Sequence, residues 1–358
     1  MIVSSISKVF IPAAAAFAVG ILFAPILTHY LYKYRVWKKS EGKTALDGSP
    51  AVEFEKLRTT VHTGTETSTP RMGGILIWFS VSFVTFVLWA LAQLIPIPLF
   101  EKLDFLSRSQ TWVPLFTLLA GALMGFVNDL YDIRPSGERG VPLRIRLLFV
   151  TLIALFIGTW FYAKLGVTAI GIPADGVLTL GIFIIPLFVL ITLGLYAGGV
   201  IDGIDGLSGG VFGAAFTAYA GIAYFQSQVD LAAFCATLAG AILAFLWFNI
   251  PPARFWMTET GTMGLTMTLA VVAFMTDALG DGYGVAALPI IAFPLVVTVL
   301  SNIAQVLSKR FRGKKLFRIA PLHHHFEAIG WPPYKVTMRY WIISIVSAIL
   351  GMTVALLK

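Results

Sequence analysis

Gly73 to Ile95 reads GGILIWFSVSFVTFVLWALAQLI, a run of 23 residues with no charged side chain. About 20 apolar residues in a helix are enough to cross the roughly 30 Å hydrocarbon core of a bilayer. The whole chain shares this character, since 58% of its 358 residues are hydrophobic, 12% are charged and the mean hydropathy is +0.84. Soluble globular domains are far more polar. The sequence therefore predicts an all-α, polytopic integral membrane protein.

Similar apolar runs recur along the chain, and the polar stretch from 34 to 71 is the longest interruption. The predicted spans are 9–32, 73–95, 112–131, 145–163, 178–198, 208–226, 230–250, 262–279, 286–308 and 338–357. The first is too long for the apolar region of a signal peptide, and Lys and Arg follow it, so we expect it to remain as a membrane helix. The prediction is about ten transmembrane helices.

Most of the 26 Lys and Arg residues fall in alternate loops, those after the first, third, fifth, seventh and ninth predicted spans. Positively charged loops stay in the cytosol, so both termini are predicted to lie outside. We expect one transmembrane domain over 1–358, with cytosolic active-site loops at 34–71, 129–144, 199–207, 251–261 and 309–337. The net charge of +8 is then mainly a topology signal and gives no reason to expect nucleic acid. Disulfides within the chain are excluded, because Cys235 is its one cysteine.

Carboxylates gather at the predicted cytosolic ends of the spans. Asp129 and Asp132 are three residues apart, so on a helix they share a face and could hold a cation; alternatively, nearby arginines such as Arg144 and Arg146 balance a solvated helix end. Asp202 and Asp205 lie in the stretch 198–210, which contains six glycines. That stretch is either a flexible turn or a loop whose free amides approach a ligand.

Two further segments carry unusual polar residues. Glu259 is a lone acid among apolar and hydroxyl residues, and a buried carboxylate costs several kcal/mol unless it is paired or bound to a metal, so it is the predicted metal ligand. Trp256 offers a flat face for a base, or belongs to the aromatic belt of the membrane interface. His323, His324 and His325 lie in a basic loop, where hydrogen bonds to a pyrophosphate suit them better than a zinc site does.

Four motifs carry a resemblance to a known family. They are Thr69-Pro-Arg-Met-Gly-Gly74, Asp202-Gly-Ile-Asp-Gly-Leu207, Met257-Thr-Glu-Thr-Gly261 and Pro321-Leu-His-His-His-Phe-Glu327. Together with the acidic end of the third span, they resemble the polyprenyl-phosphate N-acetylhexosamine-1-phosphate transferases along nearly the whole chain. The triple histidine followed by Gly330-Trp-Pro332 is similar to the muramoyl-pentapeptide branch of that family.

The resemblance implies transfer of phospho-N-acetylmuramoyl-pentapeptide from UDP-N-acetylmuramoyl-pentapeptide to undecaprenyl phosphate, with release of UMP and formation of lipid I. It also implies Mg²⁺ as cofactor, which in such sites is held by one or two carboxylates and substrate phosphates. A bacterial cytoplasmic (inner) membrane location with a cytosolic active site, and a homodimer, are further expectations from the resemblance.

Carried over by position, the resemblance assigns roles to individual residues. Glu259 would hold magnesium, and the other expected catalytic residues are Asp129, Asp132, Asp202, His323, His324 and His325. The expected substrate-binding residues are Asp205, Asn249, Trp256, Gln305, Arg144 and Arg146.

The chain departs from the family pattern at several of these positions. Asn128 replaces the first aspartate of the acidic pair, so no general base is available there. Asp132 replaces the lysine of the muramoyl branch, Gly199 replaces an asparagine, Glu259 replaces an aspartate, and the stretch from 62 to 69 lacks the usual lysine. Because a phosphomonoester is largely ionised at neutral pH, direct attack by the lipid phosphate is favoured.

Two alternatives to the muramoyl-pentapeptide transferase stay open. One is a related transferase that uses another UDP-N-acetylhexosamine, which Asp132 favours and the triple histidine opposes. The other is a non-catalytic membrane scaffold, which Asn128 and Gly199 favour. A transporter is less consistent, because the acids lie at helix ends and not near the bilayer midplane.

Overall fold

The computed structural model describes residues 2–38, 67–134, 140–173, 176–278 and 282–357. Its helices are α1 (Ile2–Lys33), α3 (Ile75–Leu94), α4 (Pro98–Leu103), α5 (Trp112–Asp132), α6 (Leu143–Leu165), α7 (Ile184–Gly198), α8 (Leu207–Phe225), α9 (Val229–Asn249), α10 (Thr258–Ala278), α11 (Gly284–Ile291), α12 (Phe293–Arg312), α13 (Leu322–Ala328) and α14 (Pro333–Leu356). Two 3₁₀ turns, Gly181–Phe183 and Gly199–Ile201, flank α7. The strands β1 (Ala169–Ile172) and β2 (Gly176–Thr179) form one antiparallel hairpin.

The all-α, polytopic class is confirmed. By length and composition, eight helices among the described residues could cross a membrane, or nine if α11 and α12 form one bent span. The predicted span 208–226 corresponds to α8, which is not among these nine although it is 19 residues long. Its glycines and its Ser, Thr and Tyr residues lower its hydropathy, and its small residues suit a helix that packs closely against neighbours on most sides.

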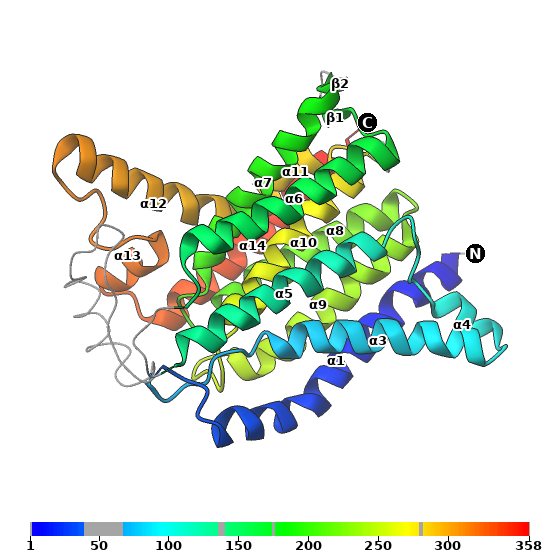
Figure 1. The fold of residues 1–358 in the computed structure, drawn as a ribbon, viewed down its shortest axis with the longest axis horizontal. Coiled ribbons are helices and arrows are strands. Elements are labelled where there is room, and N and C mark those ends of the chain that lie inside the picture. The colour runs from blue at the N-terminus through cyan, green and yellow to red at the C-terminus, as the bar shows by residue number, and fades with distance from the viewer. Residues whose placement is uncertain (1, 39–66, 135–139, 174–175, 279–281, 358) are drawn as a thin grey trace.

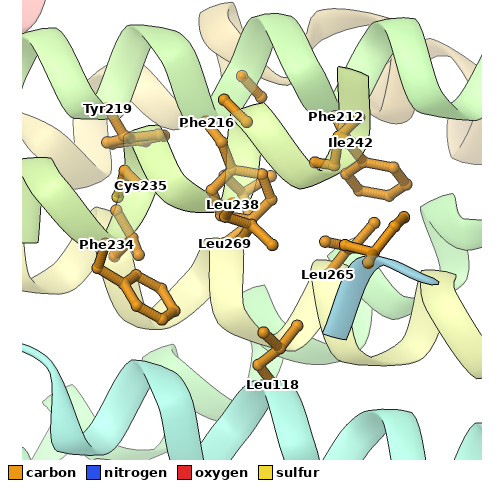
Figure 2. Close-up of a cluster of buried hydrophobic side chains, with 14 of the residues drawn as sticks. Leu118, Phe212, Phe216, Tyr219, Phe234, Cys235, Leu238, Ile242, Leu265 and Leu269 are labelled. Carbon is orange, nitrogen blue, oxygen red and sulfur yellow. The ribbon is translucent and has the colours of Figure 1, made fainter. Parts of the chain in front are cut away.

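The centre of the protein is formed by α8, α9 and α10. In α10, 94% of the most apolar window is buried, more than in any other candidate span. Figure 2 shows aromatic residues of α8, including Phe212 and Phe216, facing Leu238 of α9 and Leu265 of α10. Close packing of such side chains is the main stabilising term between these helices. The position of α10 matters because its first turn carries Glu259.

The helix bundle has two distinct ends (Figure 1). Both chain termini and the β1–β2 hairpin lie at one end, and α13 lies at the other. At the hairpin end, Asp277 in the last turn of α10 accepts hydrogen bonds from the backbone N–H groups of Gly171 and Val285, at 2.9 and 3.0 Å. Its carboxylate therefore joins β1 and the start of α11 to the central helix.

A bend of 68° separates α11 from α12. Pro294 stands in the first turn of α12, where its missing N–H does not interrupt a helical hydrogen bond but favours a new helix start. The bend directs α12 away from the bundle (Figure 1) and leaves Leu300, Ile303 and Leu307 exposed. The helix ends with basic residues, and Gly313 follows with a left-handed φ of 64°.

Several predicted loops contain helical residues. Helix α10 begins at Thr258, four residues before the predicted boundary, and α13 lies within the predicted loop 309–337. The histidines are therefore helical, because Pro321 provides an extended residue from which the short helix α13 can start. The predicted loop 129–144 begins with the last turn of α5 and ends at the start of α6. Residues 39–66 of the predicted loop 34–71 lie outside the described residues.

Candidate active site

The first turn of α10 is held by the segment that precedes α3. The N–H of Gly73 donates to the carbonyl of Trp256 at 2.7 Å, and the N–H of Trp256 donates to the carbonyl of Pro70 at 2.9 Å. These backbones approach so closely that a Cβ on Gly74 would lie 2.3 Å from the nitrogen of Gly261. Glycine is required at such a contact. The motif 69–74 thus has a structural role, because it fixes the position of residues 256–261.

Helix α5 also packs against the first turn of α10. A Cβ on Gly125 would lie 1.9 Å from the carbonyl oxygen of Glu259. One turn later, Asp129 is fully buried, and its Oδ2 accepts hydrogen bonds from the Thr260 N–H at 2.9 Å, the Thr260 hydroxyl at 2.6 Å and the Thr258 hydroxyl. Asp129 therefore serves as an acceptor for the N-terminal donors of α10.

Two non-glycine residues at this junction adopt left-handed backbone conformations, Met72 with a φ of 66° and Thr258 with a φ of 54°. The Met72 N–H donates to the Thr258 hydroxyl at 3.1 Å. Such conformations cost about 1–3 kcal/mol each and persist where surrounding contacts impose them. This strain lies directly beside the candidate metal ligand.

Glu259 differs from Asp129 in its access to solvent. Its side chain is 26% exposed, and Oε1 lies 2.5 Å from Nη1 of Arg146 on α6. The carboxylates of Asp129 and Asp202 are close enough to repel it electrostatically. The structure thus brings Glu259, Asp129, Asp202 and Arg146 together, and Glu259 is partly exposed whereas Asp129 is fully buried. Arg144, by contrast, is an exposed residue at the start of α6.

Asp132 is part of an ion-pair network that the sequence analysis missed. Arg71 Nη2 lies 3.1 Å from Asp132 Oδ2 and 3.5 Å from Asp129 Oδ1, and Lys38 Nζ lies 3.6 Å from Asp132 Oδ2. Burial lowers the pKa of Arg71, but attraction to Asp129, Asp132 and Asp202 outweighs it and raises that pKa. The guanidinium therefore stays charged and neutralises the buried acids.

Asn128 has a structural contact. Its Oδ1 accepts a hydrogen bond from the Val141 N–H at 2.9 Å, and its Nδ2 lies 3.5 Å from Asp129 Oδ1. The side chain is 5% exposed. An amide suits this position, because it accepts from one neighbour and donates to the other, whereas a carboxylate can only accept.

Asp202 connects the glycine-rich loop to α10. Its Oδ1 accepts from the Ser208 hydroxyl at 2.6 Å and its Oδ2 from the Thr258 N–H at 2.7 Å. Burial raises the pKa of the Asp202 carboxyl, although these hydrogen bonds and the attraction of Arg71 act in the opposite direction. The loop between α7 and α8 is thus an ordered part of the site.

Asp205 and Asn249 fix the loop segments around Trp256. Trp256 Nε1 donates to Asp205 Oδ1 at 2.9 Å, and the Ala253 N–H donates to Asp205 Oδ2 at 3.0 Å. Asn249 is 1% exposed and bonds the Gly206 N–H and the Phe255 carbonyl, both at 2.9 Å. These polar atoms hold the loops, and the partly exposed Trp256 ring is the surface that a ligand could contact.

The three histidines have different surroundings. A Cβ on Gly203 would lie 2.7 Å from His324 Nε2 and 2.9 Å from His323 Nε2, so two imidazoles reach the Asp202–Asp205 loop. His325 lies apart from them, where its Nδ1 accepts from the Arg318 N–H at 3.2 Å. Burial and then the charge of Arg318 lower the pKa of His325.

Gln305 supports the segment that leads to α13. Its Nε2 donates to the carbonyl of Phe317 at 3.0 Å, and its Oε1 accepts from the N–H groups of Leu316 and Phe317 at 3.0 and 2.9 Å. Both polar atoms of the amide therefore bond backbone groups of the segment before α13. Its contacts thus order the histidine segment, and a role of Gln305 in substrate binding stays a prediction.

Comparison with known proteins agrees with the motifs. The family model described as Glycosyl transferase family 4 matches residues 111–277. A phospho-N-acetylmuramoyl-pentapeptide-transferase of Anoxybacillus flavithermus is 31% identical over 341 residues, which cover 95% of each chain. A protein of the same name from Geobacillus sp. strain WCH70 is 35% identical over 80% of this chain and 83% of its own length. Another from Bacillus velezensis is 31% identical over 94% of each chain. This chain belongs to the phospho-N-acetylmuramoyl-pentapeptide-transferase family.

The residues present fit the magnesium expected of such a transferase only if the substrate completes the site. Within the described ranges, no three His, Cys, Asp or Glu side chains come together in a way that could hold a metal ion unaided. Magnesium usually keeps several waters and takes one or two carboxylates plus substrate phosphates. Glu259 offers a hard oxygen donor that is partly exposed, whereas both Asp129 and Asp202 are engaged by hydroxyl and N–H donors.

Proposed function

We propose that this transferase moves phospho-N-acetylmuramoyl-pentapeptide from its UDP carrier to undecaprenyl phosphate, releasing UMP and forming lipid I for peptidoglycan synthesis. The names of relatives that span 95% of each chain support this reaction. The observation that carries it is a physical link between distant motifs. Asp202 bonds the first turn of α10, next to Glu259, while the adjacent Gly203 meets the imidazoles of His323 and His324.

The same proposal includes a location. We place this membrane protein in the bacterial cytoplasmic membrane with its active site on the cytosolic side. The basic last turn of α12 supports that orientation, because it lies at the end of the bundle opposite the chain termini (Figure 1). Lys38 and Arg71 add positive charge at the site, where both pair with Asp132. A homodimer stays a prediction.

The chemistry does not require a base at position 128. An ionised oxygen of the lipid phosphate attacks the phosphorus that bears the sugar, and the bond from that phosphorus to the bridging oxygen breaks, so UMP leaves with the electron pair. Asn128 is engaged by the Val141 N–H and cannot accept a proton. The lipid phosphate is already largely ionised near neutral pH.

The chain's arginines are suited to the anionic groups that this reaction brings together. Nε of Arg71 and Nε of Arg146 are buried without a hydrogen-bond partner in the part of the chain that the structure describes. A buried N–H of this kind requires a partner, and a phosphate oxygen or a water would supply one. Magnesium, when bound by Glu259, would add positive charge against the diphosphate. The guanidinium of Arg146 would then pair with a substrate phosphate in place of Glu259.

A sister transferase that uses UDP-N-acetylglucosamine is the second candidate. Its support in the sequence was Asp132, which the structure places in ion pairs with Arg71 and Lys38. A residue neutralised in this way is a weak indicator of donor specificity. The muramoyl-pentapeptide donor is therefore the better supported substrate.

The test is UMP release by purified protein with undecaprenyl phosphate and magnesium, comparing UDP-N-acetylmuramoyl-pentapeptide with UDP-N-acetylglucosamine. We expect release with the pentapeptide donor only. Release with the glucosamine donor alone would transfer the assignment to the sister branch, and no release from folded protein would favour a scaffold. Asp277→Asn is the matched control, because it alters a buried carboxylate at the far end of the bundle.

A further inference from the structure

Helix α13 contains a buried pair of ionisable side chains one turn apart. His324 Nδ1 lies 2.7 Å from Glu327 Oε2, and the two residues are 6% and 3% exposed. Residues at positions i and i+3 of a helix share a face, so the short helix itself brings them together. Glu327 has no role in the reaction proposed above.

We infer that Glu327 is a positioning residue, which holds a proton on His324 Nδ1 and thereby directs Nε2 at the Asp202–Asp205 loop, where it meets the substrate diphosphate. This inference rests on the proposed function. It concerns how one imidazole is prepared for an anion, and not whether the reaction occurs.

The position of the proton follows from the chemistry of the two groups. An ionised carboxylate can only accept a hydrogen bond, and an imidazole is a stronger base than a carboxylate. The proton shared by His324 and Glu327 therefore belongs on Nδ1. Carboxylates fix the tautomer and ring orientation of metal-bound and catalytic histidines in the same manner.

The other ring nitrogen points toward the site. A Cβ on Gly203 would be 2.7 Å from His324 Nε2, which places this atom against the backbone between Asp202 and Asp205. When the diphosphate binds there, a second proton on Nε2 would make an imidazolium. That ion would donate to Glu327 through Nδ1 and to a phosphate oxygen through Nε2, a charge-assisted arrangement. The Glu327 carboxylate, beside Nδ1, would stabilise the positive charge of this imidazolium.

A purely structural role for Glu327 makes a different prediction. In that case its replacement would weaken α13, and the loss of activity would not depend on whether residue 324 is a histidine. If Glu327 is a positioning residue, the loss of activity on its replacement depends on the presence of the His324 imidazole. Double-mutant analysis separates these two cases.

The first measurement is nitrogen NMR of the full-length protein with ¹⁵N-labelled histidine, in detergent at pH 7.5, with His324→Gln used to assign the signal. We expect Nδ1 of His324 to carry a proton in the unmodified protein. An unprotonated Nδ1 would overturn the inference. This measurement requires no substrate and no altered Glu327.

The second measurement is the rate of UMP release by the unmodified protein, Glu327→Gln, His324→Gln and the double variant. Glu327→Gln should lower the rate about 10- to 100-fold, as loss of a supporting carboxylate does elsewhere. In the His324→Gln background the same change should cost less than about 3-fold. Equal losses in both backgrounds, or no loss in the first, would contradict the positioning role. Asp277→Asn, a buried carboxylate far from α13, should leave the rate unchanged.

The two measurements separate this inference from the proposed function. If the unmodified protein releases UMP with neither donor, the proposed function fails, and the NMR result still decides whether Glu327 holds the proton on Nδ1. If the unmodified protein is active and the two changes act independently, the positioning role alone fails.

Discussion

Asp129→Ala should destabilise the protein more than a change at an accessible site acid, because Asp129 is fully buried. Its Oδ2 accepts three hydrogen bonds from Thr258 and Thr260, and its Oδ1 lies 3.5 Å from Arg71. Removing one partner of such a buried charged network costs about 3–5 kcal/mol. At about 2–4 °C per kcal/mol, the apparent Tm should fall by on the order of 10 °C.

The assay is thermal unfolding in detergent, followed by the fluorescence of the chain's tryptophans, together with UMP release at a permissive temperature. Asp129→Asn keeps an acceptor for the threonines and loses mainly the charge, so it should cost about 2 kcal/mol. Asp277→Ala is the matched control, since it removes a buried carboxylate from the other end of α10. It should lower Tm while sparing the rate. If Asp129→Ala unfolds at the same temperature as the unmodified protein, the hydrogen-bond network inferred around Oδ2 is wrong.

Three further predictions concern the site. Glu259→Gln should abolish magnesium-dependent UMP release while leaving the protein folded, since the glutamine amide keeps an oxygen that can accept the hydrogen bond from Arg146; near-normal turnover would remove Glu259 as the metal ligand. Gly203→Ala should lower the rate at least about 10-fold, because the added methyl group would overlap the ring nitrogens of His323 and His324; an unaffected rate would show that α13 can move away. His325→Asn should remove an acid-dependent loss of stability. The folded pKa of His325 lies below its usual value of about 6.5, so in the unmodified protein stability is lost as pH falls through that value, when the unfolded chain binds a proton that the folded chain does not. Tm measured from pH 7.5 to 5.5 checks this, and equal slopes for both proteins would refute it.

The sequence was sufficient to predict the helical membrane class, because apolar runs of 20 residues carry that signal directly. Local patterns also located the acids and histidines of the candidate site. They could not show that Asp129 is enclosed by threonines while Glu259 remains accessible, since burial depends on how α5, α6 and α10 pack. Nor could they show that the amides of Asn249 and Gln305 bond backbone groups; substrate binding by these two residues stays a prediction.

Arg71 illustrates a different limit. In the sequence this residue stands out only as part of a motif, although a basic residue just before an uncharged span is a visible signal. Its partners are 58 and 61 positions away in the chain, and no periodicity connects them. Likewise, the pairing of Asp202 with the Thr258 N–H requires the tertiary fold. Residue types at helix ends indicated which groups matter, but their pairing came from the packing of the bundle.

The close approach of Gly74 and Gly125 to the first turn of α10 divides the site into two kinds of position. Backbone contacts backbone at these two glycines, so even the one carbon of an alanine side chain would not fit. The backbone frame that carries the reactive groups therefore does not tolerate substitution at these glycines. The side chains that project from this frame are free of that restriction. Lengthening an aspartate to Glu259 moves a carboxylate by one methylene without disturbing a backbone contact. Attempts to alter donor preference should therefore substitute the projecting groups and leave the glycines as they are.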